Sequence, residues 1–280
     1  MAVPVARTAK ALRRAVAGWR DAGERVALVP TMGALHDGHL ALVRLAKRRA
    51  GRVVVSIFVN PTQFGPGEDL SKYPRTFADD RGRLEGLADL IFAPAVEEIY
   101  PDGAATTVSV AGPAAVGLED RFRPTHFAGV ATVVAKLLIQ AMPDIALFGE
   151  KDYQQLKVVT RMAADLHLPV RIVPGPTVRE PDGLALSSRN RYLSAEERAQ
   201  APLLHRTLQA CAGAIRAGTP LEQALAQAHR SVTAAGFDLD YLEVRDADTL
   251  EPVAAAGGAP LRILVAARLG TTRLIDNITV

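Results

Sequence analysis

The sequence predicts an α/β protein, with a doubly wound, Rossmann-like parallel sheet followed by a smaller C-terminal α+β domain. Segments of strand and helix character alternate through the first part of the chain, as right-handed βαβ units require. The segment 52–58 is a mostly apolar run, which is typical of parallel strands covered on both faces. The Pro- and Gly-rich stretch 173–177 then marks a boundary, so we predict domains at 1–175 and 176–280.

Each element of the first domain has its own local signal. Thr8 is a candidate N-cap for a helix whose residues Leu12, Val16 and Trp19 share one face, and Gly23 ends that helix. The apolar run 26–30 predicts the first strand. The rest of the pattern predicts helices at 38–50, 76–88, 125–141 and 153–167, and strands at 52–58, 89–93, 106–110, 144–148 and 170–173.

The second domain is predicted to be a small lid. Ser194 and Glu197 form a capping-box pattern that opens a long helix. A second helix is predicted at 220–235, and strands are predicted at 240–244, 261–267 and 273–275. The composition also changes after the boundary stretch, which supports a separate domain.

Composition indicates an ordinary soluble globular protein. The 280 residues are 49% hydrophobic and 22% charged, so the chain can bury a large core. The single cysteine, Cys211, excludes an internal disulfide and fits a reducing compartment. No apolar run reaches the length of a membrane span, and residues 1–8 lack the apolar core of a secretory signal. We therefore expect a cytoplasmic location and no membrane partner.

A nucleic-acid-binding module is the main alternative from another class. Only the isoelectric point near 9.2 suggests it. The net charge is +3 and aromatic residues make up 5%, whereas such a module needs a clustered basic face with stacking aromatics. The sequence therefore predicts no nucleic-acid partner.

Two histidines mark the most informative position in the chain. His36 and His39 lie where the first strand gives way to a helix, with Gly38 between them. A helix N-terminus presents free N–H groups to an anion, and glycine allows a phosphate to approach the backbone. The pattern is that of the HxGH signature of nucleotidyl-transferring enzymes. The alternatives are a helix cap, core packing, or a zinc pair, although zinc usually needs three or four protein ligands.

Three further clusters follow predicted strands or the domain boundary. In the segment 148–155, Lys151 can neutralise a phosphate, Asp152 can bind ribose hydroxyls or simply cap a helix, and Gln155 can reach a substrate. The triplet 187–189, Ser-Ser-Arg, is either a polyphosphate grip or an ordinary turn. In the segment 60–64, the amides of Asn60 and Gln63 suit a small hydroxy acid, unless they only build a proline-stabilised turn.

Weaker signals concern a metal and a second histidine. Asp79 and Asp80 are candidates for holding Mg²⁺ through water, or they form an exposed helix start. Arg123 and His126 precede a helix and are candidates for the site or for a subunit contact.

The motifs 29–40, 58–64, 148–156 and 187–193, taken together and in this order, resemble the pantoate–β-alanine ligases, or pantothenate synthetases. The resemblance covers essentially the whole chain. It implies a two-step ligation, in which the carboxylate of pantoate attacks the α-phosphate of ATP to give pantoyl adenylate and pyrophosphate. The amine of β-alanine then displaces AMP. ATP, pantoate and β-alanine are the implied small-molecule substrates, with Mg²⁺ as cofactor.

The resemblance also assigns roles to individual residues. It implies that His36 and His39 stabilise the transferring phosphoryl group, while the other ATP-side residues are Met32, Gly38, Gly149, Lys151, Asp152, Val178, Leu186, Ser187, Ser188 and Arg189. Gln63 and Gln155 match the glutamines that hold pantoate, with Asn60 and Tyr73 nearby, and Asp79 and Asp80 match a region near Mg²⁺. Leu186 departs from a common Met, and Arg83 departs from the Gln of some members.

Two alternative functions remain within the enzyme class. A different ligase or nucleotidyltransferase on the same scaffold would share the histidine motif, but the paired glutamines favour a small hydroxy acid. A dehydrogenase would need a GxGxxG turn after the first strand, and the segment 30–34 does not supply it.

We expect a homodimer through the N-terminal domain, partly from the resemblance and partly because a strand at 106–110 could pair with a partner.

Overall fold

The computed structural model describes residues 2–280, and its first domain is built on a six-stranded parallel sheet. The spatial order of the strands is β1-β4-β3-β2-β5-β6. The longer central strands are mostly apolar runs whose side chains face both ways, as the sequence predicts. Their bounds are β1 (Val5–Ala6), β2 (Val26–Thr31), β3 (Arg52–Ile57), β4 (Leu90–Phe92), β5 (Ile145–Gly149) and β6 (Arg171–Gly175).

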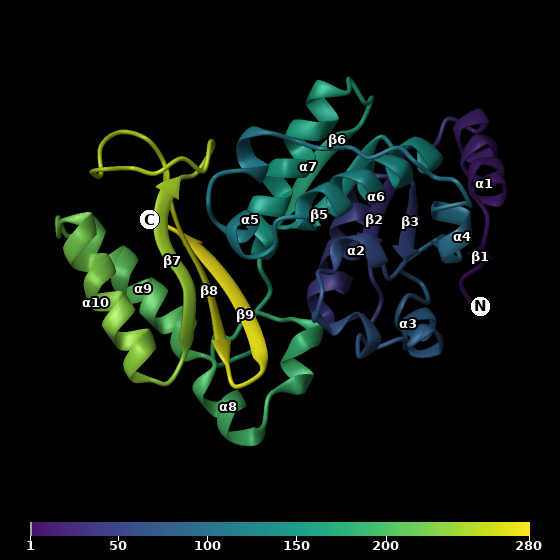
Figure 1. The fold of residues 1–280 in the computed structure, drawn as a ribbon. Helices are drawn as coiled ribbons and strands as arrows, with labels where there is room; N and C mark the ends of the chain where they lie inside the picture. The colour runs from purple at the N-terminus through teal and green to yellow at the C-terminus, as the bar shows by residue number, and fades with distance from the viewer. Residues whose placement is uncertain (1) are drawn as a thin grey trace.

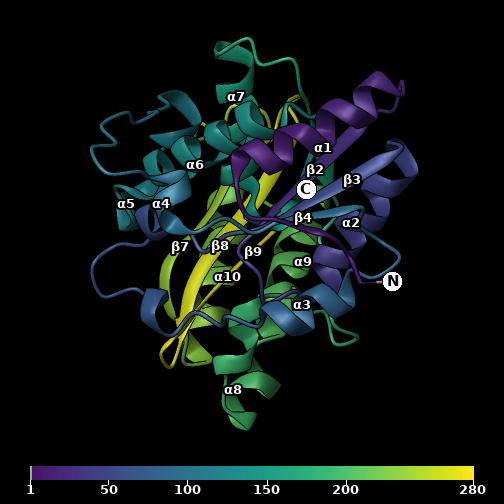
Figure 2. The same cartoon turned by 90° about the vertical axis from the view of Figure 1, so that its right-hand side faces the viewer.

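Helices cover both faces of this sheet, as the turned view makes plain (Figure 2). One face packs against α1 (Ala9–Asp21), α6 (His126–Ala141) and α7 (Tyr153–Asp165), and the other packs mainly against α2 (Asp37–Arg49) and the end of α3 (Phe77–Arg83). Successive residues of β2 alternate between the two cores, with Leu28 in the first and Val29 in the second. The doubly wound fold class is therefore confirmed.

The second domain packs a three-stranded antiparallel sheet between two helices and the first domain (Figure 1). The elements are α8 (Ala195–Gln200), α9 (Leu203–Arg216), α10 (Leu221–Ala234), β7 (Asp238–Asp246), β8 (Leu261–Leu269) and β9 (Thr272–Thr279). Tyr241 and Leu264 join the core of the first domain, whereas Leu242 and Val265 pack with the helices. Both faces of this sheet are thus buried, so the second domain is anchored to the first along its length.

Three predicted elements are wrong or too long. Residues 106–110 do not form a strand, because the backbone N–H of Val108 bonds to the Thr132 side chain of α6 at 2.9 Å and no strand pairs with this segment. The helix predicted at 76–88 ends at Arg83, and Gly86 then adopts a positive φ of 71°. The Ser194 capping box is confirmed, but it opens the short α8, since Pro202 breaks the predicted long helix.

Short elements were the ones that the sequence pattern missed. They include β1, α4 (Val96–Ile99), α5 (Glu119–Phe122) and the 3-10 turns η1 (Pro61–Gln63), η2 (Asp69–Ser71), η3 (Gly112–Ala114), η4 (Glu150–Asp152) and η5 (Ser188–Tyr192). One turn of helix has too few residues to show a periodicity. Across residues 2–280, no helix is both long and apolar enough to cross a bilayer.

Candidate active site

The site lies where the order of the strands reverses. After β2 the chain adds β3 and β4 on one side, and it then places β5 on the other side of β2. The connections that leave the carboxyl ends of β2 and β5 diverge, and such a crevice is the usual ligand site of an open parallel sheet. The first connection carries His36 and His39, and the second carries Lys151.

The loop after β2 is held in an unusual conformation by Asp80. Gly33 and Ala34 have φ angles of 82° and 49°, a region that costs energy for a residue with a side chain. Asp80, buried in α3, accepts hydrogen bonds from the backbone N–H groups of Ala34 at 2.9 Å and Leu35 at 2.7 Å. These bonds fix the loop that delivers His36 to the crevice.

His36 and His39 cap α2 reciprocally. The Nδ1 atom of His36 accepts from the Gly38 N–H at 3.2 Å, and the Nδ1 atom of His39 accepts from the His36 N–H at 3.3 Å. The two ring centroids are 4.0 Å apart. Gly38 is needed for this arrangement, because a Cβ there would lie 2.9 Å from the His36 ring. The helix-cap interpretation of the histidines is therefore confirmed.

The same geometry sets the charge and tautomer of both rings. Burial and the positive charge of Lys151 lower the pKa of His36 to about 4, and burial and the neighbouring His36 lower the pKa of His39 to about 3. Both imidazoles are therefore neutral at pH 7. Since each Nδ1 accepts a hydrogen bond, each ring carries its proton on Nε2. Burial thus keeps both rings neutral, and capping leaves the donating N–H of each ring on Nε2.

Lys151 and Asp152 occupy η4, between β5 and α7. The Nζ atom of Lys151 lies 3.7 Å from Oδ2 of Asp152, and the Lys151 side chain is mostly buried. Asp152 stands at the N-cap position of α7, but its side chain makes no capping hydrogen bond. Its carboxylate, about half exposed, is therefore not committed to capping the helix and is free to accept hydrogen bonds from the hydroxyl groups of a ligand.

The segment 187–189 faces a loop from the first domain. Ser187 caps η5 by accepting from the Arg189 N–H at 3.2 Å, and Ser188 shares a 3.1 Å hydrogen bond with the Tyr73 hydroxyl. Arg189 donates to both carboxylate oxygens of Asp69, at 2.9 and 2.8 Å. The triplet thus forms a turn and also carries the side chains expected of a phosphate grip.

Asn60 holds the side chain of Gln63 through a hydrogen bond. Asn60 is 1% exposed, and its amide donates to Gln63 Oε1 at 3.1 Å and to the Gly129 carbonyl at 3.2 Å. Gly129 allows α6 to approach this turn, since a Cβ there would collide with the Thr62 carbonyl group. Nε2 of Gln63 faces the Met32 sulfur at 3.0 Å. Asn60 therefore orients the amide of Gln63.

These connections enclose one cavity of about 210 Å³. Every residue predicted for the ATP side and for the small substrate lines it, including Val178 and Leu186 from the domain boundary and Gln155 from α7. Gln154, the neighbour of Gln155, is buried instead and bonds to the Glu119 N–H and the Pro113 carbonyl. The structure thus brings together residues from five separate stretches of the chain, which are 32–39, 60–63, Tyr73, 149–155 and 178–189.

The paired aspartates do not fit the predicted magnesium site. Neither Asp79 nor Asp80 lines the cavity. Both oxygens of Asp80 are occupied by backbone N–H groups, and Asp79 is exposed on α3. Over residues 2–280, no cluster of three or more His, Cys, Asp or Glu side chains is arranged to hold a metal. Asp80 instead positions the loop before α2.

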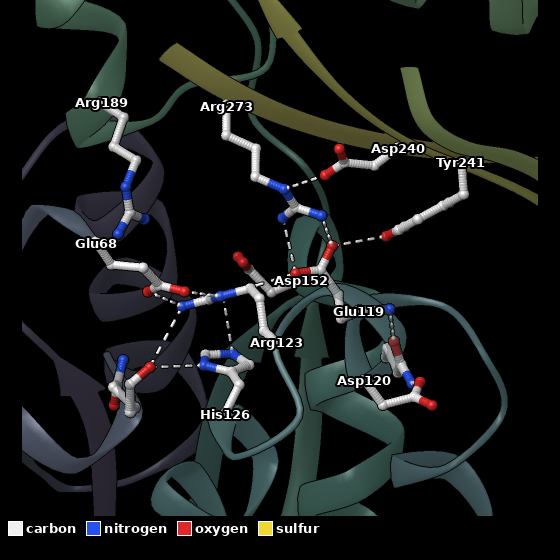
Figure 3. A network of polar contacts seen from close by, with 12 residues as sticks. Glu68, Glu119, Asp120, Arg123, His126, Asp152, Arg189, Asp240, Tyr241 and Arg273 are labelled. Carbon is white, nitrogen blue, oxygen red and sulfur yellow. Dashed lines mark hydrogen bonds and ion pairs between the residues drawn. The ribbon is translucent and has the colours of Figure 1, made fainter. Parts of the chain in front are cut away.

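A wider cleft of about 650 Å³ continues from the cavity between the two domains. Lys151, Asp152 and Arg189 line both spaces. On its wall, Arg123 pairs with Glu68 at 2.7 Å and lies 3.6 Å from Glu119, which Arg273 of β9 also binds (Figure 3). The ion pairs thus join a loop of the first domain to the second domain.

His126 belongs to this wall. Its Nδ1 lies 3.0 Å from the Gln63 carbonyl, and burial and Arg123 lower its pKa to about 4. The sequence singled out Arg123 and His126 without deciding their place, whereas Glu68, Asp69 and Glu119 were missed. Charged residues in loops and single-turn helices carry no local signal of a distant partner.

Fold and cavity together define a Rossmann-like α/β protein with a polar cavity where its strand order reverses. Comparison with known proteins then identifies the family. The model of the family described as pantoate-beta-alanine ligase matches residues 4–279, and this chain belongs to that family.

Curated relatives agree over their full length. A pantothenate synthetase of Bradyrhizobium sp. (strain BTAi1) is 61% identical over 99% of this chain and 98% of its own length. One from Rhodopseudomonas palustris (strain CGA009) is 60% identical over the same shares.

Solved structures match the fold as well. A crystal structure of pantothenate synthetase from Thermus thermophilus has a TM-score of 0.93 and 49% identity, covering 99% of both chains. A pantoate-beta-alanine ligase from Francisella tularensis, complexed with beta-gamma ATP and beta-alanine, has a TM-score of 0.83 and 33% identity, covering 99% of this chain and 98% of its own.

Proposed function

We propose that this chain joins pantoate to β-alanine at the expense of ATP, through a pantoyl-adenylate intermediate. Family membership supports the reaction, and the Francisella relative was crystallised with an ATP compound and β-alanine. The observation that carries the proposal is that the histidine-capped N-terminus of α2, Lys151 and the segment 187–189 line one cavity together with Gln63 and Gln155.

In the first step a carboxylate oxygen of pantoate attacks the α-phosphorus of ATP. The bond from that phosphorus to the bridging oxygen breaks, and pyrophosphate leaves. The protein's task is to position the reactants and to stabilise charge on the phosphoryl oxygens. Neutral Nε2–H groups of His36 and His39 donate hydrogen bonds, and Lys151 supplies positive charge. No nucleophilic side chain is needed.

The small substrate is assigned to the amides of Gln63 and Gln155. Amides form directional hydrogen bonds to hydroxyl and carboxylate groups, whereas they add no charge to attract a triphosphate. Asn60 fixes the Gln63 amide, so its orientation is set before the substrate binds. Tyr73 lines the same cavity and joins it to Ser188.

In the second step the amine nitrogen of β-alanine attacks the acyl carbon of pantoyl adenylate. The bond from that carbon to the phosphate oxygen breaks, the amine loses a proton, and AMP leaves. The intermediate reacts readily with water, so it must be shielded. The second domain and the loop carrying Asp69 and Tyr73 border the cavity and serve as the cover.

Mg²⁺ is assigned to the phosphates of ATP. It usually keeps several waters and binds substrate phosphates with only one or two carboxylates, and when bound it neutralises charge on those phosphates. Asp152 is the carboxylate in the cavity whose oxygens are not committed to backbone groups.

We further propose that the enzyme is a cytoplasmic homodimer.

Exchange of labelled pyrophosphate into ATP tests the mechanism. With Mg²⁺, ATP and pantoate but without β-alanine, the enzyme should catalyse exchange, because the first step is reversible and does not require β-alanine. Omitting pantoate should abolish exchange, and adding β-alanine should lead to net release of AMP. Exchange without pantoate, no exchange at all, or ADP as product would contradict the proposal.

A further inference from the structure

Asn277 of the last strand contacts the turn that carries Lys151. Its Nδ2 donates to the carbonyl oxygens of Glu150 at 3.0 Å and Lys151 at 2.8 Å. These two residues lie more than a hundred positions earlier in the chain, in η4. Because Asn277 is only 3% exposed, water does not compete well for these bonds.

The Asn277 amide is itself held in one orientation. Carbonyl oxygens only accept hydrogen bonds, so the Nδ2 end must face η4. The Oδ1 end accepts from Nε of Arg262 at 2.7 Å, and the Arg262 guanidinium lies 3.9 Å from the centroid of the Tyr153 ring. Arg262 also approaches Glu150 Oε2 at 3.6 Å. The amide is thus fixed from both ends.

The neighbour of Asn277 makes the end of β9 rigid. Asp276 binds Arg179 through both carboxylate oxygens, at 2.7 and 2.8 Å, and accepts from the Asn277 N–H at 2.7 Å. Arg179 follows β6 and the domain boundary, so this cluster ties β9 to the connection between the domains. A strand held in this way can hold η4 in turn.

Fixing two successive carbonyl groups of η4 also fixes where the Lys151 side chain starts. The Cα–Cβ direction of a residue follows from its backbone, and a flexible lysine reaches a given point only from a restricted set of starting positions. A displacement of about 1 Å at a reacting group can cost about 10²-fold in rate. The contact therefore bears directly on the Lys151 ammonium.

We propose that Asn277 is a positioning residue, through which the second domain sets the place of the Lys151 ammonium in the phosphate site. This inference rests on the proposed function of Lys151. The second domain then does more than shield the intermediate, because part of the first-step machinery is assembled only when β9 is in place.

A double-mutant cycle in the pyrophosphate exchange assay tests the proposal. Asn277→Asp keeps the size of the side chain and its bond to Arg262, but it cannot donate to the two carbonyl groups. We expect it to slow exchange by about 10-fold or more in the otherwise unchanged protein. In the Lys151→Ala background the same change should cost less than about 2-fold, since the group it positions is gone.

A matched variant controls for a general weakening of the domain contact. Tyr241→Phe removes a buried 2.8 Å hydrogen bond from β7 to Glu119 that involves no residue of η4. It should reduce the free energy of unfolding by an amount similar to Asn277→Ala, yet it should change exchange by less than about 2-fold. Asn277→Ala should behave like Asn277→Asp in the exchange assay.

Each result decides between the inference and the proposed function. Independent, multiplying losses in Asn277→Asp and Lys151→Ala would overturn the positioning role while leaving Lys151 in place. Normal exchange in both Asn277 variants would overturn it as well. Normal exchange in Lys151→Ala would contradict the proposed function itself. Failure of both Asn277 variants to fold, with Tyr241→Phe folded, would assign Asn277 to stability alone and reject the proposal.

Discussion

Arg189, which lines the cavity, binds both carboxylate oxygens of Asp69, although the two residues lie 120 positions apart. The pair joins the segment 187–189 to η2 in the first domain. A triphosphate that reaches this arginine must compete with Asp69 for the same two N–H donors. We therefore expect Asp69 to affect ATP affinity, although it lies outside the set of residues predicted to bind ATP.

Asp69→Asn should lower the KM for ATP by several-fold and change kcat little. The neutral amide competes less well than a carboxylate for the guanidinium. Glu68→Gln is the matched control, because it loosens the same loop at Arg123 and leaves Arg189 paired. A raised KM in Asp69→Asn, or the same fall in both variants, would argue against competition.

His36→Asn separates helix capping from catalysis. Asparagine is a good N-cap, so the free energy of unfolding should change by less than about 0.5 kcal/mol, whereas His36→Ala should cost about 1 kcal/mol. Both variants lose the Nε2–H donor and should lose about 10²-fold in pyrophosphate exchange. Denaturant unfolding and exchange rates check the two parts separately. Normal exchange in His36→Asn would reduce the histidine to a cap.

The lowered pKa values of His36, His39 and His126 predict how the protein responds to acid. In the folded state these rings stay neutral down to about pH 4, 3 and 4, whereas in the unfolded chain they take up protons near pH 6.5. Between pH 6.5 and 4 the unfolded state therefore binds more protons, so the free energy of unfolding falls as the pH falls.

Nuclear magnetic resonance measures the protonation of these three histidine rings directly. The Cε1–H signals of these three rings should not shift between pH 6 and 8 in the folded protein, but they should titrate near pH 6.5 in urea. Midpoints near 6.5 in the folded protein would show that the rings carry charge in the working range.

Gln63 and Gln155 should select pantoate and not ATP. Replacing either by Ala removes neutral hydrogen bonds, so the KM for pantoate should rise by at least about 5-fold, which corresponds to about 1 kcal/mol. The KM for ATP should stay near normal. Initial-rate measurements with each substrate varied in turn check this, and a defect confined to ATP would move both glutamines to the nucleotide side.

The homodimer prediction rests on the family resemblance alone. Residues 106–110 form no strand, so no sheet edge is available there for a partner. The family resemblance still favours a dimer. Light scattering at micromolar concentration should give about twice the chain mass of 29.8 kDa, and the mass of a single chain would reject the prediction.

The sequence by itself determined the parallel sheet, the main helices and most of the site. His36 and His39 illustrate the reason. Their spacing, the preceding strand and the following helix are all local, and hydrogen bonds between neighbouring residues build the capping box. Lys151 and the segment 187–189 likewise carry side chains whose chemistry is independent of the rest of the chain. Residue type and position, after a strand for Lys151 and after the domain boundary for the segment 187–189, were enough to single them out.

Only the tertiary structure decided which distant groups meet. Asp80 was predicted near Mg²⁺ but binds the loop before α2, while Asp69 and Asn277 were not predicted at all. The sequence pattern also did not show that both faces of the sheet β7–β9 are buried. Tyr241 and Leu242 are both largely apolar side chains, and only the fold shows that they pack into different cores. A contact between residues far apart in the chain depends on where the whole fold brings them, and neither residue's neighbours in sequence record it.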